Sequence, residues 1–404
     1  MRDPARCPPP VIPADVMPAV DGFVIAARPA AHFGVGSIAR LPALVAATGA
    51  AGVLVVTDGA LAATPVVAAV LGVLEEAGVP ARVFSGVHPN PTTADIAAGA
   101  AAAATAPPGT RTTLVAVGGG SPIDAAKGIA VAAVNPERGR DLDYRNRFAA
   151  PALPIVAVPT TAGTGAETNA FGVVTDPVAR RKFYVGHPSA MPAAAVLDPA
   201  LTVGLPPQVT AATGMDALIH ALESYLSLHP NPWSDGLALQ AIRMVAAYLP
   251  RACADGADLA ARSQLLLAAH LAGVAMAGTG LGICHAIGHS LGARWDIPHG
   301  VALSAVLPGV LRFNLPARLP RMADIAFALG AGDTHAGAGR NAAAAIEAVA
   351  ALRDRIGLAA PIADLGVTES DFAAIAADAL GDEVLANTPR APTAADIAAI
   401  LRAS

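Results

Sequence analysis

Two segments in the second half of the chain place carboxylate and imidazole groups at helical spacing. Asp216 and His220 stand at i, i+4 in the stretch GMDALIHALESY, and His285 and His289 repeat that spacing in a second apolar stretch. Residues four apart lie on the same face of a helix. His299 follows soon after, between Pro298 and Gly300. A carboxylate with several imidazoles suits a divalent ion such as Fe²⁺ or Zn²⁺, so we predict a metal site in this group.

The alternative is a purely structural role, in which these histidines are ordinary core or surface residues of Ala/Leu-rich helices. Two such pairs together favour the metal site over that alternative. The remaining histidines lack such neighbours in the sequence, and we interpret them as structural. They are His32, His88, His187, His229, His270 and His335.

The same segment also contains a competing motif. Gly288-His289-Ser290-Leu291-Gly292 matches G-x-S-x-G, which would make Ser290 the nucleophile of a serine hydrolase, with Asp333 and His335 as possible partners. That motif requires a strand before the serine and a helix after it. Here the approach, LGICHAI, has a helical pattern. The context therefore argues against the hydrolase.

The elements that must position these groups differ between the two halves of the chain. In the first half, short apolar runs alternate with helical stretches, which predicts a doubly wound, Rossmann-like α/β domain with a parallel sheet. The expected strands are Gly52–Asp58, Ala81–Gly86, Thr113–Val117 and Pro154–Pro159, with shorter ones in FGVVTD, RKFYVG and AAVLDP. From about Pro206 onward the pattern is helical. We predict an α/β domain over 1–203 and an all-α domain over 204–404, with residues 1–20 as a loose arm.

Glycine-rich loops follow two of the expected strands. Gly118, Gly119 and Gly120 precede Ser121, which we expect to cap a helix that begins there. PTTAGTGAE follows the next strand. Backbone N–H groups at a helix start favour a phosphate, and a doubly wound sheet binds nucleotides at such loops. The first loop alone could be a plain strand-to-helix turn. The two loops together predict that the domain binds a dinucleotide.

Asp58 ends the first expected strand. Its carboxylate can accept hydrogen bonds from a ribose diol and would repel a 2′-phosphate, which favours NAD over NADP. A turn-forming role in Thr-Asp-Gly is an equal alternative.

The bulk composition excludes several classes of protein. Net charge is −5, charged residues make up 14%, and no basic block indicates nucleic-acid binding. The N-terminus lacks the apolar region of a secretory signal, and Ala98–Ala106 is too short to span a membrane. Three cysteines at wide spacing argue against a disulfide framework. We therefore expect a cytoplasmic protein without a membrane partner.

The motifs GGGSPIDAAKG, PTTAGTGAE, GMDALIHALESY and HAIGHSLGARWDIPHG, in this order and spacing, resemble the iron-containing (group III) alcohol dehydrogenases. The resemblance covers the chain from about Gly34 to Arg390. It implies Fe²⁺ or Zn²⁺ bound by Asp216, His220, His285 and His299, with His289 beside the site as a proton relay. It implies NAD contacts from Asp58, Gly118, Gly119, Gly120, Ser121, Asp124, Thr160, Thr161, Thr164 and Lys182.

The resemblance also implies an activity and an assembly. Members transfer hydride between a small alcohol and NAD, or reduce the aldehyde or ketone, and many are homodimers or larger. Where the family often reads Asn-Pro-Arg, this chain has Asn387-Thr388-Pro389-Arg390, which puts the substrate in doubt. We expect Phe171 and Val384 to line the substrate pocket. A metal-free reductase of the maleylacetate reductase type, a lyase of the dehydroquinate synthase type and a non-enzymatic metal-binding module are the alternatives.

Overall fold

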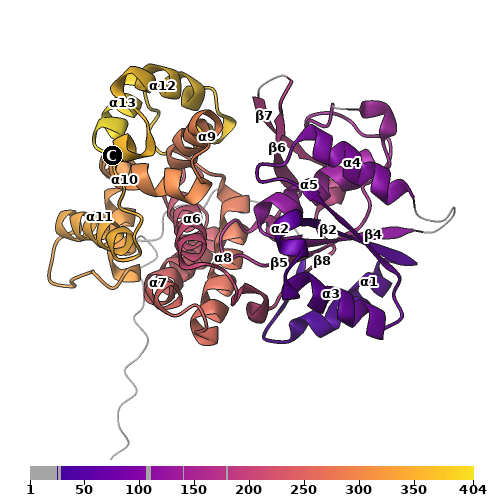
Figure 1. The fold of residues 1–404 in the computed structure, drawn as a ribbon. Coiled ribbons are helices and arrows are strands. Elements are labelled where there is room, and N and C mark those ends of the chain that lie inside the picture. Colours follow the sequence, from indigo (N-terminus) through magenta and orange to yellow (C-terminus); the bar gives the residue numbers. More distant parts are fainter. Residues whose placement is uncertain (1–24, 26–28, 106–110, 140, 179–180) are drawn as a thin grey trace, which may run out of the picture.

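The computed structural model describes residues 25, 29–105, 111–139, 141–178 and 181–404, and the N-terminal arm expected over 1–20 lies outside them. Figure 1 shows two adjoining halves, an α/β half drawn in purple and a helical half running from pink to yellow. This arrangement confirms the fold class predicted from the sequence.

A six-stranded parallel sheet forms the centre of the α/β half, in the order β1-β8-β5-β4-β2-β3. Its strands are β1 (Ala30–Phe33), β2 (Gly52–Asp58), β3 (Ala81–Val87), β4 (Thr112–Gly118), β5 (Ile155–Pro159) and β8 (Ala194–Leu197). The four longer predicted strands correspond to β2, β3, β4 and β5. The edge strand β1, whose sequence AAHF carries no apolar run, was not predicted.

Helices cover both faces of this sheet, as alternating side chains require. In β4, Leu114 belongs to the same buried cluster as Ile129 of α5, while the next residue, Val115, belongs to the cluster of Leu74 in α3. The helices α1 (Leu41–Ala47) and α3 (Pro65–Glu76) pack on the face of Val115. The helices α4 (Thr93–Ala104) and α5 (Gly120–Ala132) pack on the face of Leu114.

Two further predicted strands do not join the sheet. β6 (Phe171–Asp176) and β7 (Arg181–Gly186) pair antiparallel as a separate hairpin. The Asp124 carboxylate of α5 accepts a hydrogen bond from the Val173 backbone N–H at 3.0 Å, which ties the hairpin to the helix that follows the glycine loop.

The helical half is built around α6, which is buried from Gly214 to Leu226 and packs on α7, α8 and α10. Its helices are α6 (Pro207–Leu226), α7 (Pro232–Ala254), α8 (Leu259–Thr279), α9 (Ile283–Trp295), α10 (His299–Ala328), α11 (Ala338–Arg355), α12 (Phe372–Leu380) and α13 (Ala394–Arg402), with the 3-10 helix η9 (Glu383–Asn387). Only α8 and α10, among the described residues, are long and apolar enough to cross a membrane. Their most apolar windows are 56% and 72% buried, as in core helices of soluble proteins.

Candidate active site

Residues of both halves line one cavity of about 960 Å³. Its wall includes Gly120 and Ser121 from the glycine loop and, from the helical half, the residues predicted to bind a metal. The site residues predicted from the sequence that line it are Gly120, Ser121, Asp124, Thr164, Phe171, Lys182, Asp216, His220, His285, His289, His299 and Val384. The two predicted sites, for a metal and for a nucleotide, thus open into one space.

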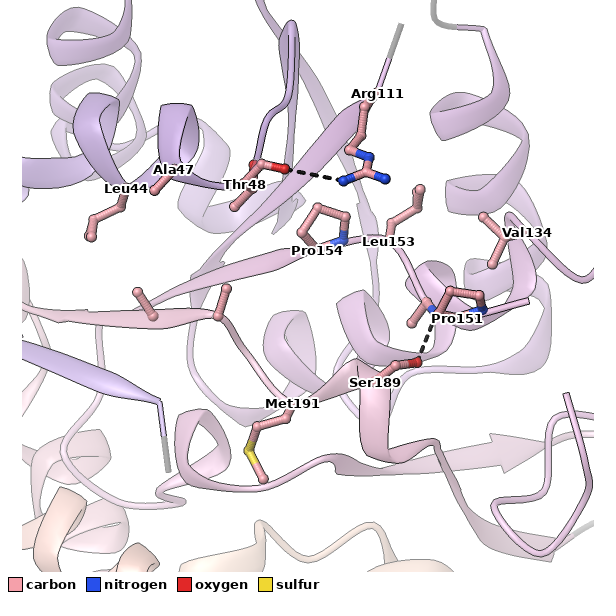
Figure 2. A pocket seen from close by; sticks show the side chains of 13 residues that line it. Leu44, Ala47, Thr48, Arg111, Val134, Pro151, Leu153, Pro154, Ser189 and Met191 are labelled. Carbon is pink, nitrogen blue, oxygen red and sulfur yellow. Dashed lines mark hydrogen bonds between the residues drawn. The ribbon is translucent and has the colours of Figure 1, made fainter. Parts of the chain in front are cut away.

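A second cavity, of about 610 Å³, lies at the opposite end of the sheet. Figure 2 shows it at the amino ends of the strands, with Arg111 donating toward the Thr48 carbonyl and Ser189 bonded to the backbone of the loop before β5. Ligands of doubly wound sheets bind at the carboxyl ends. The larger cavity is therefore the candidate active site.

The residues predicted to bind a metal converge on one carboxylate oxygen. Asp216 Oδ1 lies 3.4 Å from His220 Nε2, 3.5 Å from His285 Nε2 and 3.7 Å from His299 Nε2. Ligand atoms about 2.0–2.2 Å from a tetrahedral ion are about 3.3–3.6 Å apart, so this spacing fits an ion between them. Asp216, His220 and His285 have ligand atoms within 4.8 Å of one another, and His299 completes the group from the more open side, with its side chain 42% exposed.

The burial of these atoms also fits a metal. Asp216 Oδ1 and His285 Nε2 are buried and have no hydrogen-bond partner. Unpaired polar atoms in the interior are costly, so two of them facing each other fit a site that binds a cation. Burial alone would raise the pKa of Asp216, but the imidazoles, with His220 foremost, hold it well below its usual range. The carboxylate is therefore ready to bind a cation.

Glu223 orients His285 from behind. Its Oε2 lies 2.6 Å from His285 Nδ1 and also accepts the Gly282 N–H at 2.9 Å, while Oε1 accepts the Cys284 N–H at 2.7 Å. Burial opposes the charged form of His285, yet the carboxylates of Asp216 and Glu223 raise its pKa to about 9. With Nδ1 held in this way, Nε2 is the ring nitrogen that faces Asp216.

His289 stands apart from the four. Its ring is stacked on that of His299 at 5.6 Å, and its Nδ1 lies 2.7 Å from Asp382 Oδ2. Burial would raise the pKa of Asp382, but the hydrogen bond with His289 lowers it below its usual value. His289 lines the cavity with its side chain 20% exposed, which suits a group that exchanges protons with a bound molecule.

The two glycine-rich loops pack against each other so closely that side chains would not fit. A Cβ on Gly120 would lie 2.9 Å from Thr164 Cγ2, and one on Gly119 would lie 3.2 Å from Thr161. Gly118 has φ +148°, which L-residues rarely adopt. Gly120 lines the cavity with bare backbone at the start of α5, the position expected for a phosphate. Gly118, Gly119, Thr160 and Thr161 lie behind this surface, outside the cavity wall.

The predicted cap of α5 was wrong. Gly119 in extended conformation precedes the helix, α5 begins at Gly120, and Ser121 lies within its first turn. The turn at Gly118 reverses the backbone earlier than a serine cap would, because only glycine adopts that φ without strain. Ser121 thereby lines the cavity rather than closing the helix end.

Other predicted cofactor residues have structural partners as well. Asp58 Oδ1 accepts the Leu61 N–H at 2.8 Å and caps the short helix α2 (Gly59–Ala62), as the turn-forming alternative expected. Lys182 Nζ donates to Asn90 Oδ1 at 2.9 Å at the cavity wall, and burial lowers its pKa. The contacts of Asp58 and Lys182 with a nucleotide remain predictions.

The hydrolase alternative is wrong. Ser290 lies in the middle of α9, with no strand before it, and its hydroxyl donates to Asp378 Oδ2 at 2.9 Å. The G-x-S-x-G nucleophile elbow needs an exposed turn between a strand and a helix. Ser290 instead joins α9 to α12.

Two residues that orient the site were missed from the sequence. Glu223 stands at i+7 from Asp216, so its place on the same face of α6 was readable from the spacing. Asp382 is 93 residues from His289, and no local pattern connects them. The contact depends on the packing of α12 against α9.

Comparisons with known proteins agree with this geometry. Residues 29–199 match the family described as iron-containing alcohol dehydrogenase, and residues 210–404 match the C-terminal part of the Fe-containing alcohol dehydrogenase family. The chain is 40% identical to the 1,3-propanediol dehydrogenase of Klebsiella pneumoniae, over 87% of this chain and 88% of that protein. It is 35% identical to the NAD-dependent methanol dehydrogenase of Bacillus methanolicus, over 93% and 97%.

A solved structure of a 1,3-propanediol oxidoreductase has the same fold. Its TM-score is 0.91 at 38% identity, over 95% of this chain and 100% of that chain. Both halves of the chain are thus matched, by sequence and by fold. The chain belongs to the iron-containing alcohol dehydrogenase family.

Proposed function

We propose that the protein oxidises a small uncharged alcohol with NAD, or reduces the matching aldehyde, at a metal held by Asp216, His220, His285 and His299. Its family membership makes it an NAD-dependent alcohol dehydrogenase. The assignment of residues, metal and substrate is the proposal. The observation that carries it is the pair of unpartnered buried atoms, Asp216 Oδ1 and His285 Nε2, at the wall of the cavity that also holds the glycine loop.

The donor set defines what each group supplies. A divalent ion bound by one carboxylate and three imidazoles supplies Lewis acidity toward the carbinol or carbonyl oxygen. NAD supplies the hydride acceptor, and the protein supplies its binding and orientation. Gly120 and Ser121 at the start of α5 would hold the pyrophosphate, with Thr164 beside them.

His289 is the proposed acceptor of the proton that the alcohol releases on oxidation. Asp382 accepts its Nδ1–H, so Nε2 is free to take a proton released from the alcohol side of the cavity. In the reverse direction the same nitrogen returns a proton to the aldehyde oxygen. Asp382 keeps the ring in one orientation through both directions.

The wall of the cavity is mainly apolar. Phe171 and Val384, which we propose to contact the substrate, line it together with Met276 and Leu281, and the Phe171 ring packs edge-on against Tyr144 at 5.3 Å. Among the described residues that line this cavity, Lys182 is the one lysine or arginine. Such a wall favours a short aliphatic alcohol over an acidic or phosphorylated one, which also argues against the dehydroquinate synthase alternative.

Iron is the metal that the family name supports, with Zn²⁺ possible for the same donor set. NAD is preferred over NADP because the carboxylate of Asp58 would repel a 2′-phosphate. We also propose a cytoplasmic homodimer or larger assembly with no nucleic-acid or membrane partner. The thiols of Cys253 and Cys284, which are free in the described part of the chain, support a reducing compartment.

Metal removal and reconstitution test the proposal. Purified protein is stripped with a chelator, then reloaded with Fe²⁺ without oxygen, or with Zn²⁺, and NADH absorbance is followed with a panel of short alcohols and aldehydes. We expect stripping to abolish turnover and Fe²⁺ to restore it. Full activity in metal-free protein would refute the metal role and favour a reductase of the maleylacetate reductase type.

His285→Ala provides the matched variant. Loss of one imidazole should abolish metal binding and turnover while the protein stays folded, as judged by circular dichroism. Wild-type turnover in this variant would show that His285 does not bind the catalytic metal.

A further inference from the structure

Glu223 is the hub of a buried contact between α6 and α9. It stands on α6 one turn beyond His220, and its side chain is 6% exposed. Three donors converge on its two oxygens: the N–H groups of Gly282 and Cys284, and Nδ1 of His285. A carboxylate accepts from all three, because it has two oxygens and no hydrogen of its own.

Two of these donors belong to the start of α9. Gly282 is the N-cap of that helix and has no side chain with which to cap it. Glu223 therefore supplies the cap from a different helix, and its negative charge lies where the helix dipole favours it. The carboxylate holds the first turn of α9, and His285 lies in that turn.

We propose that Glu223 is a positioning residue of the metal centre, which fixes His285 in the form whose Nε2 is free to bind a divalent cation. In the neutral ring that a metal binds, Nδ1 donates to Glu223, so the other nitrogen carries the lone pair on the side of Asp216 Oδ1, 3.5 Å away. Histidines that bind metals commonly donate their other N–H to such a partner. This inference rests on the proposed metal site and adds Glu223 as the residue that orients one of its ligands.

Glu223→Gln removes the charge and keeps the size of the side chain. An amide has only one oxygen for the three donors. Its NH₂ group must therefore take the place of Oε1, facing the Cys284 N–H, or the place of Oε2, facing the Gly282 N–H and His285 Nδ1. On the latter side the NH₂ would donate to His285 Nδ1 and shift the ring proton to Nε2, which then cannot bind a metal. We expect the Kd for Zn²⁺ to rise about 10- to 100-fold.

Glu167→Gln is the matched control. Glu167 and His270 form another buried pair, with Oε1 and Nδ1 2.9 Å apart and side chains 3% and 11% exposed. Neither residue belongs to the proposed metal-binding group. This variant should keep the wild-type Kd for Zn²⁺ to within about threefold, while its thermal unfolding midpoint reports the general cost of breaking such a pair.

The experiment titrates metal-stripped wild-type protein and both variants with Zn²⁺ against a chromophoric chelator, and compares unfolding midpoints without metal. Weaker Zn²⁺ binding in Glu223→Gln alone supports the proposal. A Kd within about threefold of wild type would overturn it, whatever the midpoint. If Glu223→Gln does not fold, Glu223→Asp, which keeps the charge but shortens the reach to His285, must show the weaker binding. Wild-type protein that binds no Zn²⁺ or Fe²⁺ would overturn the proposed metal site as well.

Discussion

Asp382→Asn should reduce turnover by impairing the proton transfer assigned to His289. In the structure Asp382 Oδ2 lies 2.7 Å from His289 Nδ1, and Oδ1 accepts the Val384 N–H at 3.1 Å. A carboxylate can only accept from Nδ1, which leaves the His289 Nε2 lone pair in the cavity. An amide can donate to Nδ1 instead, and Nε2 then carries a hydrogen and cannot accept a proton.

The size of the effect follows from the burial of the pair. General acid–base catalysis contributes about 10²- to 10⁴-fold to a rate. His289 and Asp382 are 20% and 15% exposed, so water can partly replace the lost partner, and the amide can also turn its oxygen toward Nδ1. We therefore expect the lower end, a fall in kcat of about 10²-fold, which is about 2.7 kcal/mol.

The assay is steady-state oxidation of a primary alcohol at saturating NAD, with metal content measured for each preparation. Asp378→Asn is the control, because Asp378 on α12 contacts Ser290 and Arg294 of the same helix α9 at 2.9 and 2.6 Å. It should keep kcat within about threefold of wild type. Equal losses in both variants, or no loss in Asp382→Asn at normal metal content, would refute the assignment.

Two further substitutions separate structural from functional roles in the α/β half. Asp58→Asn keeps an oxygen for the Leu61 N–H but removes the charge, so the NADP-to-NAD ratio of kcat/KM should rise about tenfold with an unchanged unfolding midpoint; an unchanged ratio would leave Asp58 as a helix cap only. Lys127→Met removes a fully buried ammonium that donates to Asn169 Oδ1 and the Phe171 carbonyl and lies 3.6 Å from Asp124 Oδ1. It should cost about 3 kcal/mol in urea unfolding, because Asp124 loses its counter-charge; an unchanged urea midpoint would contradict this.

The sequence predicts the α/β half well where local rules decide it. β2, β4 and β5 are short apolar runs bounded by turn residues, and buried parallel strands have that pattern. β1 was not predicted because an edge strand of sequence AAHF is ordered by its pairing with β8, whose partner residues, such as Ala194 for Ala30, lie far along the chain.

The candidate site divides in the same way. Asp216, His220, His285 and His289 were found because helical spacing is local, and Glu223 carried the same signal at i+7. Ser121 was misplaced because the start of α5 depends on the unusual φ of Gly118, which a residue pattern does not specify. Asp382 could not be found, since only the approach of η9 and α12 to α9 brings it to His289.

The composition of α6 links the proposed metal site to the packing of the helical half. This helix is buried on nearly every side, yet one face carries two carboxylates and an imidazole, which a purely structural core helix would not tolerate. Glu223 is compensated within the protein by three donors, whereas Asp216 Oδ1 has none. The imidazoles already favour the charged form of Asp216, and the proposed cation would supply the partner that Oδ1 lacks. Because a ligand that binds only the folded state stabilises it, the proposed metal bound by these atoms would also stabilise the helical half.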